Sequence, residues 1–168
     1  AVAAMSTGAT LAYFEESIPM SLNPLYAKTM ADYRAQELIL DRLFYVDAVT
    51  NELRSRVVSK YELADFGRAM AVTLKTGIRW HNGQALSSKD VCFTVRAMLD
   101  DRTPSPVAAH YREFIVACDT KGAQVAVIRF NRVLPNPRER LSFTILPASE
   151  FKSTAISPDL QFSARPIG

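Results

Sequence analysis

The chain has 168 residues, enough for one domain with a hydrophobic core, and its 48% apolar content is ordinary for a globular protein. The formal net charge is only +3, and Lys and Arg are dispersed among acidic residues, which argues against nucleic acid as a partner. No uncharged apolar stretch reaches about 18 residues, so the sequence predicts no membrane-spanning helix.

The first predicted elements are a strand and a helix. Residues 9–14 are rich in β-prone side chains and predict a strand. Further along, Asn23 is expected to close a turn before Pro24, whose ring disfavours helix in the preceding residue. Residues 32–43 carry apolar side chains at helical spacing, so they predict a helix. Its apolar stripe consists of Tyr33, Leu38, Ile39 and Leu43.

The middle of the chain predicts a hairpin that leads into a capped helix. Residues 57–63 and 68–75 each alternate apolar and polar side chains, and the turn cluster 64–67 lies between them. They are therefore expected to form an antiparallel hairpin. Residues 77–98 then end a strand, turn, and begin a helix.

Within that stretch, Asn82 and Gly83 offer positive-φ residues for a tight turn. Ser87 and Asp90 have the spacing of a capping box, and the acid lies at the positive end of the helix dipole. The helix that follows has one apolar face. His81 has no acid or thiol partner at a motif spacing, so its expected role is to fix the turn against neighbouring backbone rather than to act in catalysis.

The second half continues the mixture of helices and strands. Residues 108–114 have a helical pattern, and residues 114–117 and 124–130 read as strands joined by a turn at 119–122. A helical turn is expected over residues 138–143. Together these elements predict an α+β fold, with a mixed or antiparallel sheet and helices packed on it.

The two cysteines, Cys92 and Cys118, are expected among core-facing residues, where free thiols behave as small hydrophobes. Buried thiols are the favoured interpretation and a disulfide is the alternative, because connectivity cannot be read from sequence. A zinc site formed with His81 and His110 is disfavoured, since neither C-x-x-C nor H-x3–5-H spacing is present. No metal and no cofactor are expected. The sequence also lacks G-x-S-x-G and any Gly-rich phosphate loop, which disfavours a hydrolase or other enzyme.

The stretch 77–98 closely resembles a segment of the extracellular solute-binding proteins of the oligopeptide, dipeptide and nickel class, which deliver ligands to ABC importers. In that family a basic strand leads to an aromatic residue, His, Asp or Asn, and Gly, followed by a Thr/Ser-x-x-Asp-Val helix start. The matching residues here are Trp80, His81, Asn82, Gly83, Ser87, Asp90 and Val91. The resemblance implies a structural role for these residues, rather than contact with ligand.

The resemblance also implies an organisation. The family fold has two lobes that close on a ligand by a hinge. Residues 1–37 would be the N-terminal strand and loop of lobe one, 38–146 an extra α/β domain, and 147–168 a return into lobe one. Because Pro166-Ile167-Gly168 matches the start of a longer family motif, the chain is expected to be an N-terminal fragment. The candidate ligand-facing residues are then Glu15, Glu16, Ser17 and Val107.

The function that the resemblance implies is capture of peptides, or related small ligands, for the membrane subunits of an ABC importer, in the periplasm or cell envelope and without catalysis. The alternatives are a stand-alone protein-interaction module of the same fold and a hydrolase. Self-association of the isolated fragment is a further expectation, because Leu11, Tyr13 and Phe14 would lack the lobe that covers them.

Overall fold

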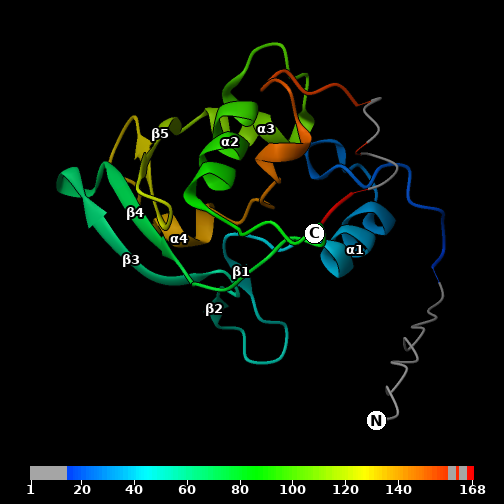
Figure 1. Ribbon diagram of the computed structural model, residues 1–168, viewed down its shortest axis with the longest axis horizontal. Helices are drawn as coiled ribbons and strands as arrows, with labels where there is room; N and C mark the ends of the chain where they lie inside the picture. Colours follow the sequence, from blue (N-terminus) through cyan, green and yellow to red (C-terminus); the bar gives the residue numbers. More distant parts are fainter. Residues whose placement is uncertain (1–14, 159–161, 163–165) are drawn as a thin grey trace, which may run out of the picture.

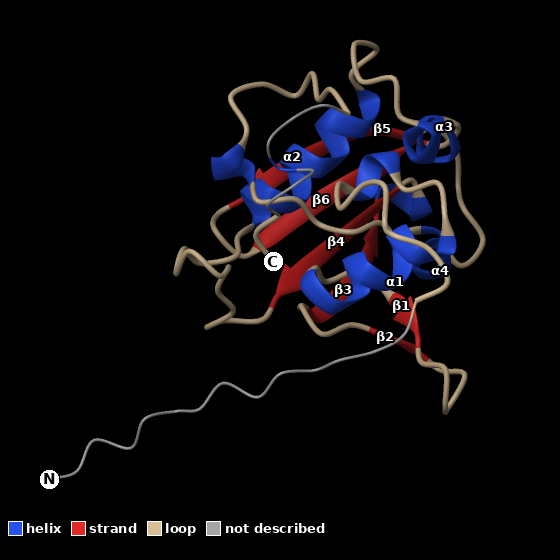
Figure 2. Ribbon diagram, turned by 90° about the vertical axis from the view of Figure 1, so that its right-hand side faces the viewer, coloured by secondary structure: helices blue, strands red, loops and turns tan. Residues whose placement is uncertain are grey.

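The computed structural model describes residues 15–158, 162 and 166–168. Its main feature is an antiparallel sheet with the strand order β3-β4-β6-β5. Helices lie over this sheet in Figure 2, and the α+β class predicted from the sequence is confirmed. The bounds are β3 Val58–Ala64, β4 Ala69–Leu74, β5 Ile115–Lys121 and β6 Val125–Phe130, with helices α1 Met30–Ile39, α2 Ser88–Leu99, α3 Pro106–Arg112 and α4 Pro137–Arg140.

The core lies between α2 and one face of the sheet. Across β4 and β6, Met70 lies opposite Ile128 and Val72 opposite Ala126, and all four side chains are buried. The helix α2 covers this face with a second set of fully buried side chains (Figure 1). These are Val91, Val95 and Met98. The alternation of β4 and β6 and the apolar face of the capped helix were therefore predicted correctly.

The predicted hairpin at 57–75 is confirmed as β3 and β4. Its turn is a short 3-10 segment, Asp65–Gly67, in which all three residues have positive φ. Gly67 suits this backbone because it has no Cβ, whereas Asp65 and Phe66 adopt the left-handed region at a cost. The strand β3 is less buried than β4, because it lies at the edge of the sheet.

The first helix is shorter than predicted and buries a different face. It ends at Ile39 instead of residue 43, and Leu38 is exposed. The cause is long-range pairing: the Leu43 amide donates to the Phe143 carbonyl, and Arg42 forms an antiparallel bridge with Thr144. This pairing draws the chain into extended structure, so tertiary contacts override the helical pattern.

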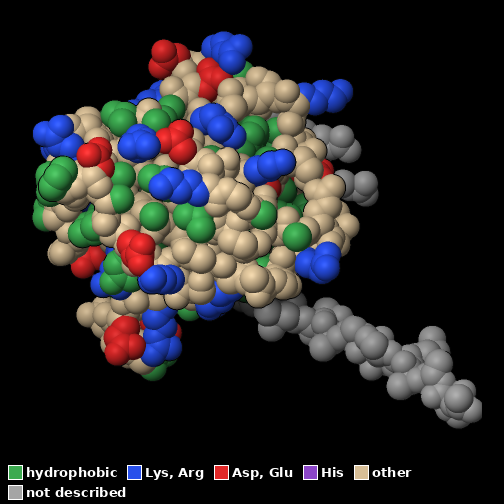
Figure 3. Space-filling model, turned by 60° about the vertical axis from the view of Figure 1, so that its left-hand side comes forward, with side chains coloured by type: hydrophobic (Ala, Val, Ile, Leu, Met, Phe, Trp, Pro, Cys, Tyr) green, Lys and Arg blue, Asp and Glu red, His purple; other side chains and the backbone are tan. Residues whose placement is uncertain are grey.

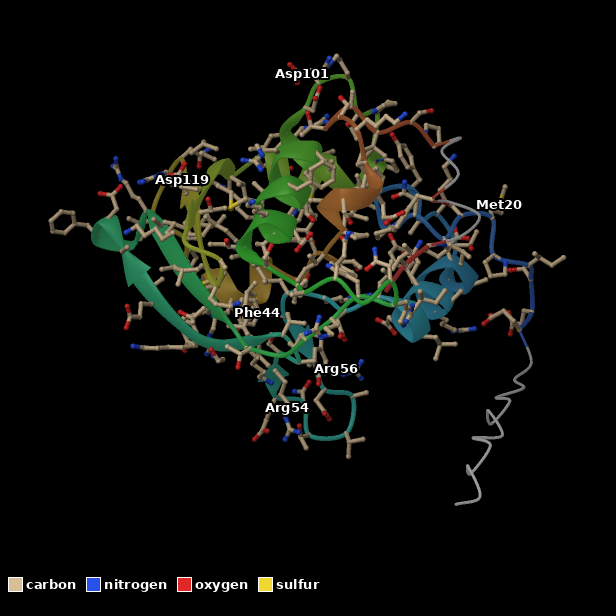
Figure 4. The ribbon with its side chains drawn as sticks, viewed as in Figure 1. Met20, Phe44, Arg54, Arg56, Asp101 and Asp119 are labelled. Carbon is tan, nitrogen blue, oxygen red and sulfur yellow. A yellow bond between two sulfur atoms is a disulfide. The ribbon has the colours of Figure 1, made fainter. Side chains whose placement is uncertain are left out.

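A small second hairpin was missed in the sequence. It pairs β1 Tyr45–Val46 with β2 Leu53–Arg54 and projects from the domain near Arg54 and Arg56 in Figure 4. The Asp47 carboxylate accepts hydrogen bonds from two amides of the connecting loop, at 3.0 Å each. Such an Asx turn can be recognised from sequence only when the flanking strands are evident.

The turn between the last two strands lies later than predicted. The strand β5 extends to Lys121, so Asp119 is a strand residue that faces Val127, and the turn is centred on Gly122, whose φ is +67°. Polar side chains on the exposed end of β5 concealed the strand. The strand predicted at residues 9–14 lies outside the described residues. None of the helices in the described part of the chain is long and apolar enough to cross a membrane.

The expectation of two free buried thiols is wrong, because Cys92 and Cys118 form a disulfide. Cys92 lies in the first turns of α2, and Cys118 lies on the side of β5 that this helix covers. Their Cα atoms are 5.0 Å apart, well within bonding geometry. Figure 4 shows the sulfur bond between α2 and the strand that carries Asp119. The bond ties the main helix to one edge strand of the sheet.

Candidate functional site

Residues 15–17, which were expected to face a ligand, belong to the segment 15–21, which Asp32 holds against α1. One carboxylate oxygen of Asp32 accepts from the amides of Met20 and Ser21 at 2.6 and 3.1 Å. The other accepts from the amides of Lys28 and Thr29 at 2.8 and 2.9 Å. One side chain therefore fixes the loop and caps the helix that follows it.

Asp32 is fully buried, yet its carboxyl group stays ionised. Burial alone would raise its pKa, but the four backbone amides outweigh that effect and lower the pKa from 3.8 to about 2. Sequence reasoning missed this residue as an anchor. The available signal was Thr29-x-x-Asp32, the spacing of a capping box, which the structure contains.

The three candidate ligand residues of this segment differ in their surroundings. Glu15 forms an ion pair with Arg34 of α1, at 2.6 Å between Oε1 and Nη1, and its side chain is only 13% exposed. Its other oxygen, Oε2, is buried and has no hydrogen-bond partner among the described residues, 15–158, 162 and 166–168. Glu16 and Ser17 are exposed. The segment can thus present one constrained carboxylate and two exposed polar side chains. In Figure 4 the segment, which includes Met20, runs along the outer side of α1.

The fourth candidate, Val107, lies in a different environment. It is in the first turn of α3, half-buried and packed against the hydrophobic core. The N-cap of that helix, Ser105, accepts a hydrogen bond from Ala108 and donates one to the Leu25 carbonyl. Val107 is therefore positioned by the packing of α3 on the 3-10 turn Pro24–Tyr26, independently of the loop that carries Glu15.

Residues Trp80–Gly83 form a turn, and its geometry differs from the prediction. The Gly83 amide donates to the Trp80 carbonyl at 2.8 Å, and the Trp80 amide donates to the Gln84 carbonyl. Gly83 has a φ of +83°, whereas Asn82 does not adopt positive φ. One left-handed glycine is therefore enough to close this turn.

His81 fixes backbone, although not the neighbouring backbone that was predicted. Its amide donates to the Gly168 carbonyl at 2.7 Å, and the Gly168 amide lies 3.2 Å from its Nδ1 atom. Gly168 approaches Ile39 so closely that a Cβ at this position would lie 1.5 Å from the Ile39 carbonyl oxygen. His81 therefore joins the turn to residues 166–168 beside the end of α1.

The predicted capping box of α2 is present and has a second role. The Ser87 amide and hydroxyl both donate to one oxygen of Asp90, at 2.8 and 3.1 Å. The other oxygen accepts from the Ala148 amide at 2.9 Å. One turn later, the Thr94 hydroxyl accepts from the Leu146 amide at 2.9 Å. The first turns of α2 thus hold residues 146–148 in place through hydrogen bonds to two of their backbone amides.

A hollow lies away from these residues. It has a volume of about 530 Å³ and lies between the end of α1, the β1–β2 hairpin and α4. Four of its charged side chains form ion pairs with one another, since Arg42 contacts Glu37 at 2.7 Å and Arg56 contacts Asp41 at 3.2 Å. None of the four candidate ligand residues lines it. Within the described residues, this hollow therefore does not bring those candidates together.

Within the described ranges, no group of three or more His, Cys, Asp or Glu side chains is arranged to hold a metal ion. His110 stacks edge-on against the rings of Tyr111 and Phe114, with centroids 5.4 Å away in both cases. It therefore packs as an aromatic side chain on the surface of α3.

Comparison with protein families gives one match. The family model of bacterial extracellular solute-binding proteins, family 5 Middle, matches residues 52–168, more than half of the chain. The chain belongs to this family. Comparison with curated protein sequences gives no match. The family is described as one of solute-binding proteins.

Solved structures of solute-binding proteins share the fold. The oligopeptide-binding protein AppA from Bacillus subtilis, in complex with a nonapeptide, superposes with a TM-score of 0.80 at 22% identity, over 90% of this chain and 31% of its own. NikZ from Campylobacter jejuni, in complex with Ni(L-His), gives 0.75 at 20% identity, over 89% and 29%. The dipeptide-binding protein from Pseudoalteromonas sp. SM9913, in complex with Met-Leu, gives 0.72 at 18%, over 80% and 30%.

The TM-scores of 0.72 to 0.80 show a shared fold. The chain spans about 31% of the length of AppA and a similar share of the other two structures. The resemblance found in residues 77–98 therefore identified the family correctly.

Proposed function

We propose that this chain is part of a binding protein that captures peptides, or related small ligands, for an ABC importer, outside the cytoplasmic membrane and without catalysis. The observation that carries the proposal is the family match over residues 52–168. The bound nonapeptide, Met-Leu and Ni(L-His) of the structural neighbours supply the ligand classes to be tested.

The proposed division of the chain is 1–37, 38–146 and 147–168, with the central part as an extra α/β domain. This division is supported by backbone hydrogen bonds between residues 41–43 and residues 143–145, which lie near the two boundaries of the central part. The Ile145 amide donates to the Asp41 carbonyl at 3.1 Å, and the Leu43 amide donates to the Phe143 carbonyl at 2.9 Å. The chain thus enters and leaves the central part at adjacent points, as an inserted domain must.

We infer that Glu15, Glu16 and Ser17 form part of one wall of the ligand cleft, with Val107 contributing apolar surface. The support is the Oε2 atom of Glu15, which finds no donor in the part of the chain that the structure describes, since a buried carboxylate oxygen without a donor favours a ligand amine or amide. The Arg34 ion pair restricts the side chain, which reduces the entropy lost on binding.

Calorimetric titration with di- to pentapeptides tests the proposal. One wall of a cleft buries too little ligand surface to offset the loss of translational freedom, so this chain alone should bind no tighter than about millimolar, or roughly −4 kcal/mol. Micromolar binding by a monomeric sample would show that a complete site lies within the chain. Mass spectrometry of the same mixtures separates the alternatives, because cleaved peptides would contradict a role without catalysis.

A further inference from the structure

The outer edge of β3 combines a free strand with uncovered apolar surface. In the described part of the chain, β3 is paired on one side only, with β4. Tyr61 lies opposite Val72, and Leu63 lies opposite Met70, both of which are fully buried in the core. Tyr61 and Leu63 therefore continue the core face of the sheet, yet they are 40% and 57% exposed. Figure 1 shows this strand at the margin of the domain.

A groove of about 270 Å³ opens beside the same strand. Its walls are Tyr61 and Leu63 on one side and the segment 134–139 on the other. The Arg138 guanidinium lies 4.4 Å from the centroid of the Tyr61 ring, so the ring is oriented although one side of it faces solvent. Figure 3 shows the face on this side of the molecule, where hydrophobic side chains are interspersed with charges of both signs.

The opposite face of β3 carries a pair of opposite charges. Lys60 and Glu62 contact each other at 2.5 Å, and their side chains are 67% and 63% exposed. A free edge strand is a template for another strand. Opposite charges that lie directly across from each other stabilise such a pair, whereas like charges destabilise it, so Lys60 and Glu62 determine which strand can pair. We propose that β3 pairs with β3 of a second copy of this chain, antiparallel and with Tyr61 opposite Tyr61, to form a continuous sheet across a dimer.

The charges select this register. When two identical antiparallel strands meet with Tyr61 opposite Tyr61, Lys60 of each copy faces Glu62 of the other, so both cross-strand pairs attract. A shift by two residues in either direction places Lys60 opposite Lys60 or Glu62 opposite Glu62, and directly opposed like charges destabilise a sheet. A shift by one residue would turn the apolar face of one copy to the other side. The selected register also places the two Tyr61 rings side by side at the open groove.

The other edge of the sheet fits a second copy less well. The strand β5 carries Asp119 and Lys121, a similar pair of signs, but it ends at Lys121 and leaves almost no strand beyond the midpoint of such a pair. This edge nevertheless provides a matched control, because Lys121 is an exposed lysine on an edge strand.

Sedimentation velocity over a wide range of protein concentration tests the proposal. The unmodified chain should form a dimer as concentration rises. Lys60→Glu places Glu opposite Glu62, and Glu62→Lys places Lys opposite Lys60, so each variant alone should dimerise at least tenfold more weakly. An equimolar mixture of the two variants should recover association, because both cross-strand pairs are then of opposite sign. Both side chains are exposed, and circular dichroism of each variant confirms that it is folded.

Lys121→Glu makes the same change in net charge and should leave dimerisation unchanged. The proposal is overturned if the unmodified chain stays monomeric, if Lys121→Glu weakens association as much as Lys60→Glu, or if the mixture does not recover it. Association through Leu11, Tyr13 and Phe14 would be insensitive to the charge reversals, and that result also refutes pairing through β3. The inference does not depend on the proposed function.

Discussion

Replacement of Asp32 by Asn should destabilise the fold strongly at neutral pH. The amide side chain retains the size of the carboxylate but has one acceptor oxygen, so its NH₂ group would face two of the four backbone amides that Asp32 now accepts. The pKa shift gives an independent magnitude. A change from 3.8 to about 2 corresponds to about 2 kcal/mol of stability from the ionised group. Together with the unsatisfied donors, the expected loss is about 2–4 kcal/mol.

The pH dependence has a definite sign. The folded pKa of Asp32 lies below its unfolded value of 3.8, so its contribution is complete above that pH and is lost as the pH falls towards about 2. Urea unfolding should therefore show a difference in the free energy of unfolding between the parent and Asp32→Asn. This gap should be constant from pH 7 to pH 5 and should narrow below pH 4. Asp101→Asn, an identical change at an exposed loop position visible in Figure 4, should match the parent. A gap of similar size at pH 2 and pH 7, or no gap, would refute the reasoning.

Three further predictions concern the attachment of α2. Cys92 and Cys118 are 26 residues apart in the sequence, so reduction of their disulfide should lower the free energy of unfolding by about 3 kcal/mol. Urea unfolding with and without a phosphine reductant measures this loss, and an unchanged midpoint would contradict the prediction. Ser87→Ala should cost about 1 kcal/mol, and Asp90→Ala should cost more, because it also releases the Ala148 amide; equal thermal midpoints for both variants and the parent would refute the cap. Arg112→Lys should cost about 2 kcal/mol, because the guanidinium donates to one backbone carbonyl in the last turn of α2 and to two that follow the helix, and an ammonium group cannot reach all three; native-state hydrogen exchange at the end of α2 measures the loss, and unchanged protection would argue against it.

Elements with local signals were predictable from the sequence. The hairpin at 57–75 and the helix that begins after Ser87 are specified by patterns that span only a few residues, namely alternation, turn residues and a capping box. The same local character explains why residues 77–98 identified the family. Predictions from such patterns are correct here because the patterns depend on neighbours in the chain, and tertiary packing agrees with them.

What could not be predicted depends on partners far away in the chain. The helix α1 ends early because residues 41–43 pair with 143–145, and nothing near Ile39 encodes that partner.

The disulfide requires the register of β5 against α2, which the misplaced turn at 119–122 concealed. For the candidate site the difficulty is greater, since Glu15 and Val107 are positioned by different elements and meet no common pocket among the described residues. A cleft whose walls come from separate lobes leaves no single local pattern, so the family resemblance, and not the residue pattern, carries the assignment of those residues.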